Sequence, residues 1–153
     1  MTSVIGFDYG ERRIGVAIGV LDLQTANPLT TIMVPPSGIP WHEITAIIEE
    51  WQPSTLVVGT VSHATQNNNA IHKKVDIFCK NLNTRYHLPV ETIDESNTSA
   101  KAYEILKDMR SKGQRKKINK TDIDKASAAI ILDSWFTHET TAKSLSIDAG
   151  SKE

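Results

Sequence analysis

The sequence contains very little cysteine: Cys79 is the only one among 153 residues. A single cysteine excludes a disulfide within the chain and a zinc site made of cysteines alone, and it fits a protein of the reducing cytoplasm. Long hydrophobic runs are also absent, so we expect no membrane-spanning helix and no membrane partner. The first residues lack the basic and apolar regions of a secretory signal, so we expect a cytoplasmic location.

An excess of charge of one sign is missing as well, because 17 Lys and Arg oppose 18 Asp and Glu. The basic residues are nevertheless unevenly distributed, and seven of them lie between residues 107 and 120, where Asp108 is the only acid. They are Lys107, Arg110, Lys112, Arg115, Lys116, Lys117 and Lys120. A local positive charge of this size indicates a surface that binds the phosphates of a nucleic acid. The alternative interpretation is a solvated helix end followed by a loop.

The length fits one domain, and the hydrophobic pattern predicts alternating strands and helices. Strands are expected at residues 3–9, 13–20, 29–34, 55–60 and 89–94. Helices are expected at about 41–51, 71–82, 98–113 and 122–136. This order predicts an α/β fold with a five-stranded mixed sheet, in which an antiparallel meander precedes two parallel strands and helices flank the sheet. It is the order of a ribonuclease H-like domain, which we expect over residues 1–138, with residues 139–153 as a flexible polar tail.

Asp8 lies inside the first predicted strand, within Ile5-Gly6-Phe7-Asp8-Tyr9-Gly10. A carboxylate is costly to bury in an apolar strand unless another group pairs with it. Asp8 is therefore a candidate oxygen ligand of a divalent cation. The alternative is an ordinary Asp that begins a turn before Gly10.

Asp94 and Glu95 end the last predicted strand. Adjacent residues of a strand point to opposite faces, so only one of the two can easily share a site with Asp8. Acidic residues are also favoured just before a helix, and this offers a purely structural explanation for at least one of them.

Asp124 lies in the first turn of the last predicted helix. It could form a capping box with Thr121, which would need no catalytic role. Asp122 is an alternative capping residue, and in that case Asp124 is free to face the sheet.

Taken together, the acidic residues suggest a metal site. Carboxylates about 4 Å apart repel by ~4 kcal/mol per pair at an effective dielectric constant of about 20, so three of them converge only around cations. Oxygen ligands without Cys or His favour Mg²⁺ or Mn²⁺. Such sites hydrolyse phosphodiesters by activating a water molecule and stabilising the leaving oxygen.

The sequence resembles the YqgF (RuvX) family, Holliday-junction-resolvase-like nucleases of the ribonuclease H-like superfamily that are associated with maturation of the pre-16S rRNA 5′ end. The matching segments are Gly6-Phe7-Asp8-Tyr9-Gly10, Arg13-Ile14-Gly15-Val16-Ala17, Leu56-Val57-Val58-Gly59, Asp94-Glu95 and residues 124–132. The resemblance implies that Asp8, Glu95 and Asp124 are the catalytic carboxylates and bind Mg²⁺ or Mn²⁺. Arg12, Arg13 and the basic segment are then candidates for binding RNA or branched DNA.

The sequence departs from the family pattern in two places. After Gly59 it reads Thr60-Val61-Ser62-His63-Ala64-Thr65-Gln66 where the family usually has Leu-Pro-Leu-Asn-Met-Asp-Gly, and Ser96 replaces the Arg that follows the acidic pair. These departures leave room for a nucleic-acid-binding protein that has lost catalysis. A Holliday junction resolvase and a nucleotide-phosphate site like that of the sugar kinases are further alternatives. Either a monomer or a homodimer is compatible with the sequence.

Overall fold

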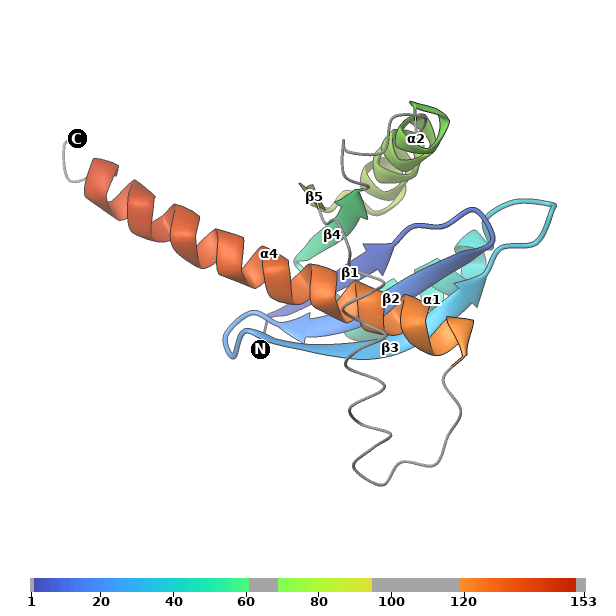
Figure 1. Ribbon diagram of the computed structural model, residues 1–153, viewed down its shortest axis with the longest axis horizontal. Helices are drawn as coiled ribbons and strands as arrows, with labels where there is room; N and C mark the ends of the chain where they lie inside the picture. Colours follow the sequence, from blue (N-terminus) through green and yellow to red (C-terminus); the bar gives the residue numbers. More distant parts are fainter. Residues whose placement is uncertain (1, 61–68, 95–118, 151–153) are drawn as a thin grey trace, which may run out of the picture.

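Five strands form one mixed sheet in the structure, a computed structural model that describes residues 2–60, 69–94 and 119–150. The strands are β1 (Ser3–Asp8), β2 (Arg13–Val20), β3 (Thr25–Met33), β4 (Thr55–Thr60) and β5 (Val90–Asp94). Their order across the sheet is β3-β2-β1-β4-β5, as Figure 1 shows. The pairs β1–β2 and β2–β3 are antiparallel, whereas β4 runs parallel to both β1 and β5. The predicted meander followed by two parallel strands is confirmed.

Strand β3 begins at Thr25, four residues earlier than the sequence predicted. Proline normally discourages a strand because it has no N–H to donate. Pro28 is accommodated here because β3 is an edge strand, and because its pairing with β2 shifts register between Val16 and Ala17. Edge strands and bulges are the places where a sheet tolerates proline.

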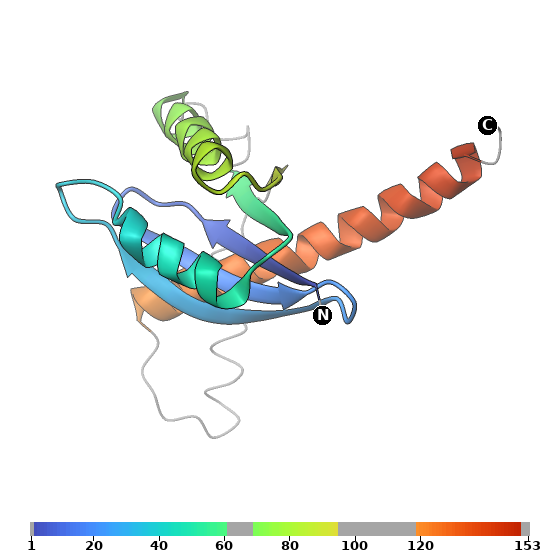
Figure 2. The same ribbon diagram turned by 180° about the vertical axis from the view of Figure 1, so that it is seen from behind.

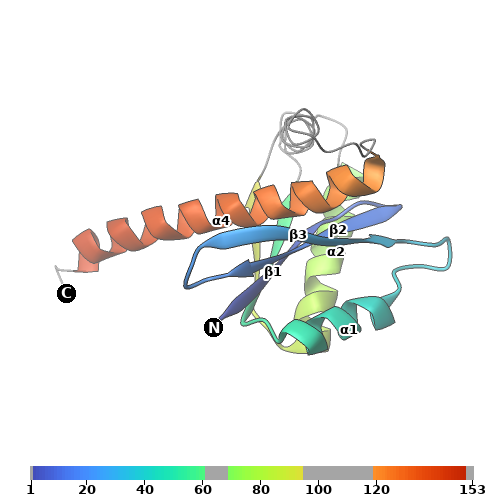
Figure 3. The ribbon, with the colours of Figure 1, turned by 90° about the horizontal axis from the view of Figure 1, so that it is seen from below.

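Helices cover both faces of the sheet. Helix α1 (Trp41–Trp51) and helix α2 (Asn69–Tyr86) lie on one face, and helix α4 (Lys120–Gly150) crosses the other (Figures 2 and 3). The helix predicted near residues 98–113 lies outside the described residues. Within the described part of the chain, no helix combines the length and the apolar character that a membrane crossing requires.

The predicted end of the last helix at Phe136 is wrong, because α4 continues to Gly150. The residues from 139 to 150, expected to belong to a flexible tail, are therefore helical. Polar side chains do not by themselves end a helix, and the sequence has neither Gly nor Pro between residues 137 and 149. The C-terminal part of α4 extends beyond the sheet in Figure 1.

The two faces of the sheet carry side chains of different size. The face toward α1 and α2 carries large apolar residues, among them Ile5, Phe7, Ile14, Val16, Leu56 and Val58. The face toward α4 is built from smaller residues, and an added Cβ at Gly6 would lie 2.5 Å from Leu132 Cγ. Backbones approach closely where side chains are small, so α4 lies unusually near this face. This closeness determines where the first turn of α4 sits.

Candidate active site

Asp8 is the last residue of β1, on the face of the sheet that α4 covers. Its neighbours across the sheet are Gly15 of β2 and Gly59 of β4. Neither neighbour has a side chain, so neither can shield or bind the carboxylate group. Burial is the main cause, and the negative charge of Asp124 the second, that together raise the pKa of Asp8 to about 7. A carboxyl group whose pKa is raised this far is a typical feature of a functional site.

Asp124 is the fifth residue of α4, one residue past the first turn, and takes no part in capping the helix. The side-chain oxygen Oδ1 of Asn119 accepts hydrogen bonds from the Asp122 N–H at 3.0 Å and from the Thr121 hydroxyl at 2.6 Å. In return, Asp122 Oδ2 accepts the Asn119 N–H at 3.4 Å. Asn119 and Asp122 thus form the capping pair. The predicted Thr121–Asp124 box is not formed. Asp122 takes part in the cap, as the alternative expected, but the residue that caps the helix is Asn119, which the sequence did not suggest, and Asp124 stays outside the cap.

The first two turns of α4 are held against the sheet at two points. The Thr31 hydroxyl of β3 donates a hydrogen bond of 2.6 Å to the Thr121 carbonyl oxygen. At Gly15, an added Cβ would lie 1.9 Å from the carbonyl oxygen of Asp124, so only glycine fits beneath the helix there. Because Gly15 is also the strand neighbour of Asp8, this contact places Asp124 close to Asp8.

Arg13, the first residue of β2, forms an ion pair with Asp124. Its Nε donates a hydrogen bond of 2.6 Å to Asp124 Oδ2, and both side chains are partly exposed. The sequence predicted Arg13 as a nucleic-acid contact and gave no sign of this pairing, because strand register and helix position together create it. Arg13 thus contacts only one of the two carboxylate oxygens of Asp124.

A cleft of about 430 Å³ lies beside the turn between β1 and β2. Its lining residues are Asp8, Tyr9, Gly10, Glu11, Arg12, Arg13 and Asp124. Arg12 is exposed, and its side chain makes no ion pair within the described part of the chain. Three carboxylates, of Asp8, Glu11 and Asp124, and two guanidinium groups therefore line a space open to solvent.

The donor set of the cleft suits a hard cation, because its possible ligands are oxygens and it contains neither Cys nor His. Asp94 ends β5 at the edge of the sheet where β1 and β4 also end. Glu95, the third predicted ligand, lies outside the described residues. Among residues 2–60, 69–94 and 119–150 there is no cluster of three or more His, Cys, Asp or Glu that could hold a metal ion.

The predicted nucleic-acid contacts are only partly described. Arg12 and Arg13 line the cleft, and Lys120 is exposed at the start of α4. The basic residues from Lys107 to Lys117 lie outside the described residues, and so do Ser96 and residues 61–66 of the altered loop.

Known proteins resemble this chain in sequence. A protein of Methylobacillus flagellatus is 40% identical over 133 residues, which is 87% of this chain and 89% of that protein. A protein of Methylococcus capsulatus is 38% identical over 136 residues, or 88% of each chain. Both carry the name "Putative pre-16S rRNA nuclease".

The fold also resembles solved structures. The RuvC protein of T. thermophilus in complex with a Holliday junction substrate superposes with a TM-score of 0.58 at 14% identity, covering 92% of this chain and 96% of that one. This likeness confirms the predicted ribonuclease H-like fold. The family described as RuvX, Holliday junction resolvase, matches residues 2–138. The predicted resemblance is thereby confirmed, and the chain belongs to the RuvX family.

Proposed function

We propose that this protein is a metal-dependent endonuclease that hydrolyses phosphodiester bonds in structured RNA, and that it matures the 5′ end of pre-16S rRNA. The observation that carries the proposal is the meeting of Asp8 and Asp124, from the first strand and the last helix, in one cleft. The names of the relatives support pre-16S rRNA as the substrate. The reaction belongs in the cytoplasm, the location that the sequence favours.

Asp8 and Asp124 would hold Mg²⁺ or Mn²⁺, and Glu95 would be the third ligand. Burial disfavours the charged form of Asp8, and no Lys or Arg of the described chain pairs with its carboxylate. A bound metal ion would supply the positive charge that Asp8 lacks. Asp124 supports the assignment because Arg13 contacts Oδ2 alone. When bound, the cation supplies an activated water molecule and neutralises charge on the phosphate.

The remaining residues of the cleft position the substrate. Arg13 orients the Asp124 carboxylate through its hydrogen bond, so that the other oxygen stays available. Arg12 is exposed at the mouth of the cleft, where its guanidinium would contact a phosphate of the substrate strand. Lys120 would contact a neighbouring phosphate from the start of α4.

Cleavage assays test the proposal directly. The substrates are an RNA that spans the 5′ end of 16S rRNA in its precursor and a four-way DNA junction, each with Mn²⁺, with Mg²⁺ or with EDTA. We expect the wild type to cut the RNA only with metal. Asp8→Asn and Asp124→Asn should each lower the rate by about 100-fold or more, because each removes a ligand charge. Asp133→Asn is the matched control, since Asp133 lies exposed on the same helix as Asp124.

Three results would overturn the proposal or redirect it. The endonuclease proposal fails if the wild type cuts neither substrate with either metal, or if Asp8→Asn cuts as fast as the wild type. Cutting of the junction but not the RNA would instead assign a Holliday junction resolvase, which the family description favours as the second candidate. Symmetric cutting of a junction needs two sites, so a homodimer in light scattering would accompany that result and a monomer would accompany RNA trimming.

A further inference from the structure

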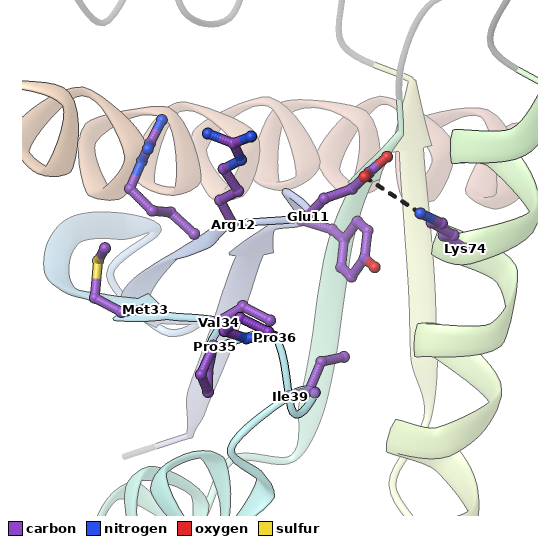
Figure 4. Close-up of a pocket in the computed structure, with 11 residues that line it drawn as sticks. Glu11, Arg12, Met33, Val34, Pro35, Pro36, Ile39 and Lys74 are labelled. Atoms are coloured by element: carbon purple, nitrogen blue, oxygen red, sulfur yellow. Dashed lines mark ion pairs between the residues drawn. The ribbon is translucent and has the colours of Figure 1, made fainter.

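A groove of about 770 Å³ adjoins the carboxylate cleft on the other side of the β1–β2 turn. Tyr9, Glu11, Arg12 and Arg13 line both hollows, so the two are continuous along this turn. The opposite wall is the segment between β3 and α1, and Lys74 of α2 closes one end. Figure 4 shows the labelled side chains around this groove. Its volume lies within the range of about 300–1,000 Å³ that is typical of small-ligand sites.

The two walls of the groove differ in chemistry. The wall after β3 is apolar and exposes Met33, Pro35 and Pro36. The cations Arg12, in the β1–β2 turn, and Arg13, at the start of β2, also line the groove. A ligand that matches both walls must combine a flat apolar surface with negative charge. A nucleotide has this combination, because its base stacks and its phosphate is anionic.

Tyr9 provides an aromatic surface between the two hollows. Its ring packs against Phe78 of α2, with 5.1 Å between the ring centroids and an interplanar angle of 41°. This contact fixes the ring, while the residue still lines the groove. A fixed aromatic ring binds a base without losing much side-chain freedom, which favours stacking.

The groove is preformed. The Val34 N–H donates a hydrogen bond of 2.8 Å to the Arg12 carbonyl oxygen, which ties the apolar wall to the arginine turn. Lys74 and Glu11 form an ion pair at 3.2 Å, which joins the same turn to α2. Because two adjacent residues of the turn are tied to two neighbouring segments, the walls need little reorganisation when a ligand binds.

We infer that this groove binds one unpaired nucleotide of the substrate strand, adjacent to the phosphate that occupies the carboxylate cleft. The base lies against Tyr9 and the proline wall, and its phosphate faces Arg12. The inference rests on the proposed function in one respect, because it takes the ligand to be a nucleic-acid strand. It adds a specific requirement: the substrate has unpaired nucleotides beside the cleavage site.

Binding assays in EDTA test the groove without cleavage. The probes are an RNA hairpin with four unpaired 5′ nucleotides, the same stem with a blunt end, and a hairpin with a deoxyribonucleotide extension. The wild type should bind the extended hairpin about tenfold more tightly than the blunt one, as expected for stacking of one base. A 2-aminopurine at the first unpaired position should lose fluorescence on binding, and one inside the stem should not. If both extensions raise the affinity above that of the blunt hairpin, the groove binds a nucleotide with either sugar. If only the RNA extension raises the affinity, the bound nucleotide belongs to RNA.

Three variants separate the groove from general charge effects. Met33→Glu places a negative charge inside the groove and should abolish the preference for the extended hairpin. Leu23→Glu is the matched control, because Leu23 is 59% exposed and Met33 is 56% exposed, and Leu23 lies in the β2–β3 turn away from the groove. Arg12→Ala should reduce the slope of log affinity against log salt by about 0.7, the value for one phosphate contact to a single strand.

The inference is overturned if the wild type binds both hairpins equally, or if Met33→Glu keeps the preference. Failure of the nuclease proposal is a separate result. A protein that prefers unpaired extensions through this groove but never cuts them supports the groove and refutes the nuclease. A protein that cuts the substrate but shows no preference for unpaired extensions supports the nuclease and refutes the groove.

Discussion

Replacement of Asp8 by Asn should stabilise the metal-free protein at neutral and alkaline pH. Asp8 must be ionised to bind a cation, yet burial and the charge of Asp124 disfavour its ionisation in the folded protein. The Asn side chain is nearly isosteric and carries no charge at any pH. The substitution therefore removes an electrostatic cost that the site imposes on the fold.

The magnitude follows from the raised pKa of Asp8. A rise from 3.8 to about 7 corresponds to up to about 4 kcal/mol, at ~1.4 kcal/mol per pH unit. Below pH ~4 the group is protonated in both states and contributes nothing. Between pH ~4 and ~7 the unfolded chain releases the proton while the folded chain keeps it, so stability falls as pH rises. Above pH ~7 the full cost remains, and it is a large fraction of the stability of an ordinary domain.

Urea unfolding in EDTA, followed by tryptophan fluorescence from pH 4 to pH 8, measures this effect. The free energy of unfolding of Asp8→Asn, relative to the wild type, should grow by up to about 4 kcal/mol across this range. Asp133→Asn serves as the control, and its difference from the wild type should stay constant. Mn²⁺ should raise the unfolding midpoint of the wild type and leave that of Asp8→Asn unchanged, because only the wild type binds the cation.

The reasoning is refuted if the difference between Asp8→Asn and the wild type does not change with pH. It is equally refuted if Asp8→Asn is the less stable protein at pH 8 in EDTA. Either result would mean that Asp8 is ionised at little cost in the folded chain, through a stabilising partner.

Three further predictions concern residues in or next to the N-terminal part of α4. Gly15→Ala should lower the free energy of unfolding by about 1–3 kcal/mol and slow cleavage, because the added Cβ displaces the first turn of α4; unchanged urea unfolding would contradict this. Ser127→Ala should leave the free energy of unfolding unchanged or raise it by about 1 kcal/mol, because the buried Ser127 hydroxyl has no hydrogen-bond partner in the described structure. A clear loss of stability in thermal unfolding would show that a partner exists. Arg13→Met should cost about 1–2 kcal/mol by leaving Asp124 without its cation, and the loss should shrink in 1 M salt; a loss independent of salt would argue for packing instead.

The fold could be predicted from the sequence to a large extent because its signals are local. The strand formed by residues 13–20 is rich in β-branched residues, and its position needed no knowledge of the rest of the chain. The early start of β3 could not be predicted, because proline within a strand depends on whether that strand lies at an edge. The sequence underestimates the length of α4, because the apolar pattern stops at Phe136 while the helix continues to Gly150.

The candidate site was predictable in its residue types and less so in its contacts. An acidic residue in an apolar strand points to Asp8 as a candidate, whereas the local sequence allows two capping schemes around Asp124 and only the structure decides between them. The ion pair between Arg13 and Asp124 joins residues 111 positions apart, and its formation depends on the close approach of α4 at Gly15. Neither the pair nor the neighbouring groove has a signal in the local sequence.

Asp8 and Asp124 belong to β1 and α4, the first and last elements that the structure describes, and this has a consequence during protein synthesis. A growing polypeptide contains Asp8 in its first strand, but it gains Asp124 only after all five strands of the sheet have been made. The carboxylate pair therefore forms only after α4 has been made and has docked on a sheet whose five strands all precede it in translation. Incomplete chains that end before residue 120 carry half of the pair, so premature termination yields fragments without an assembled centre.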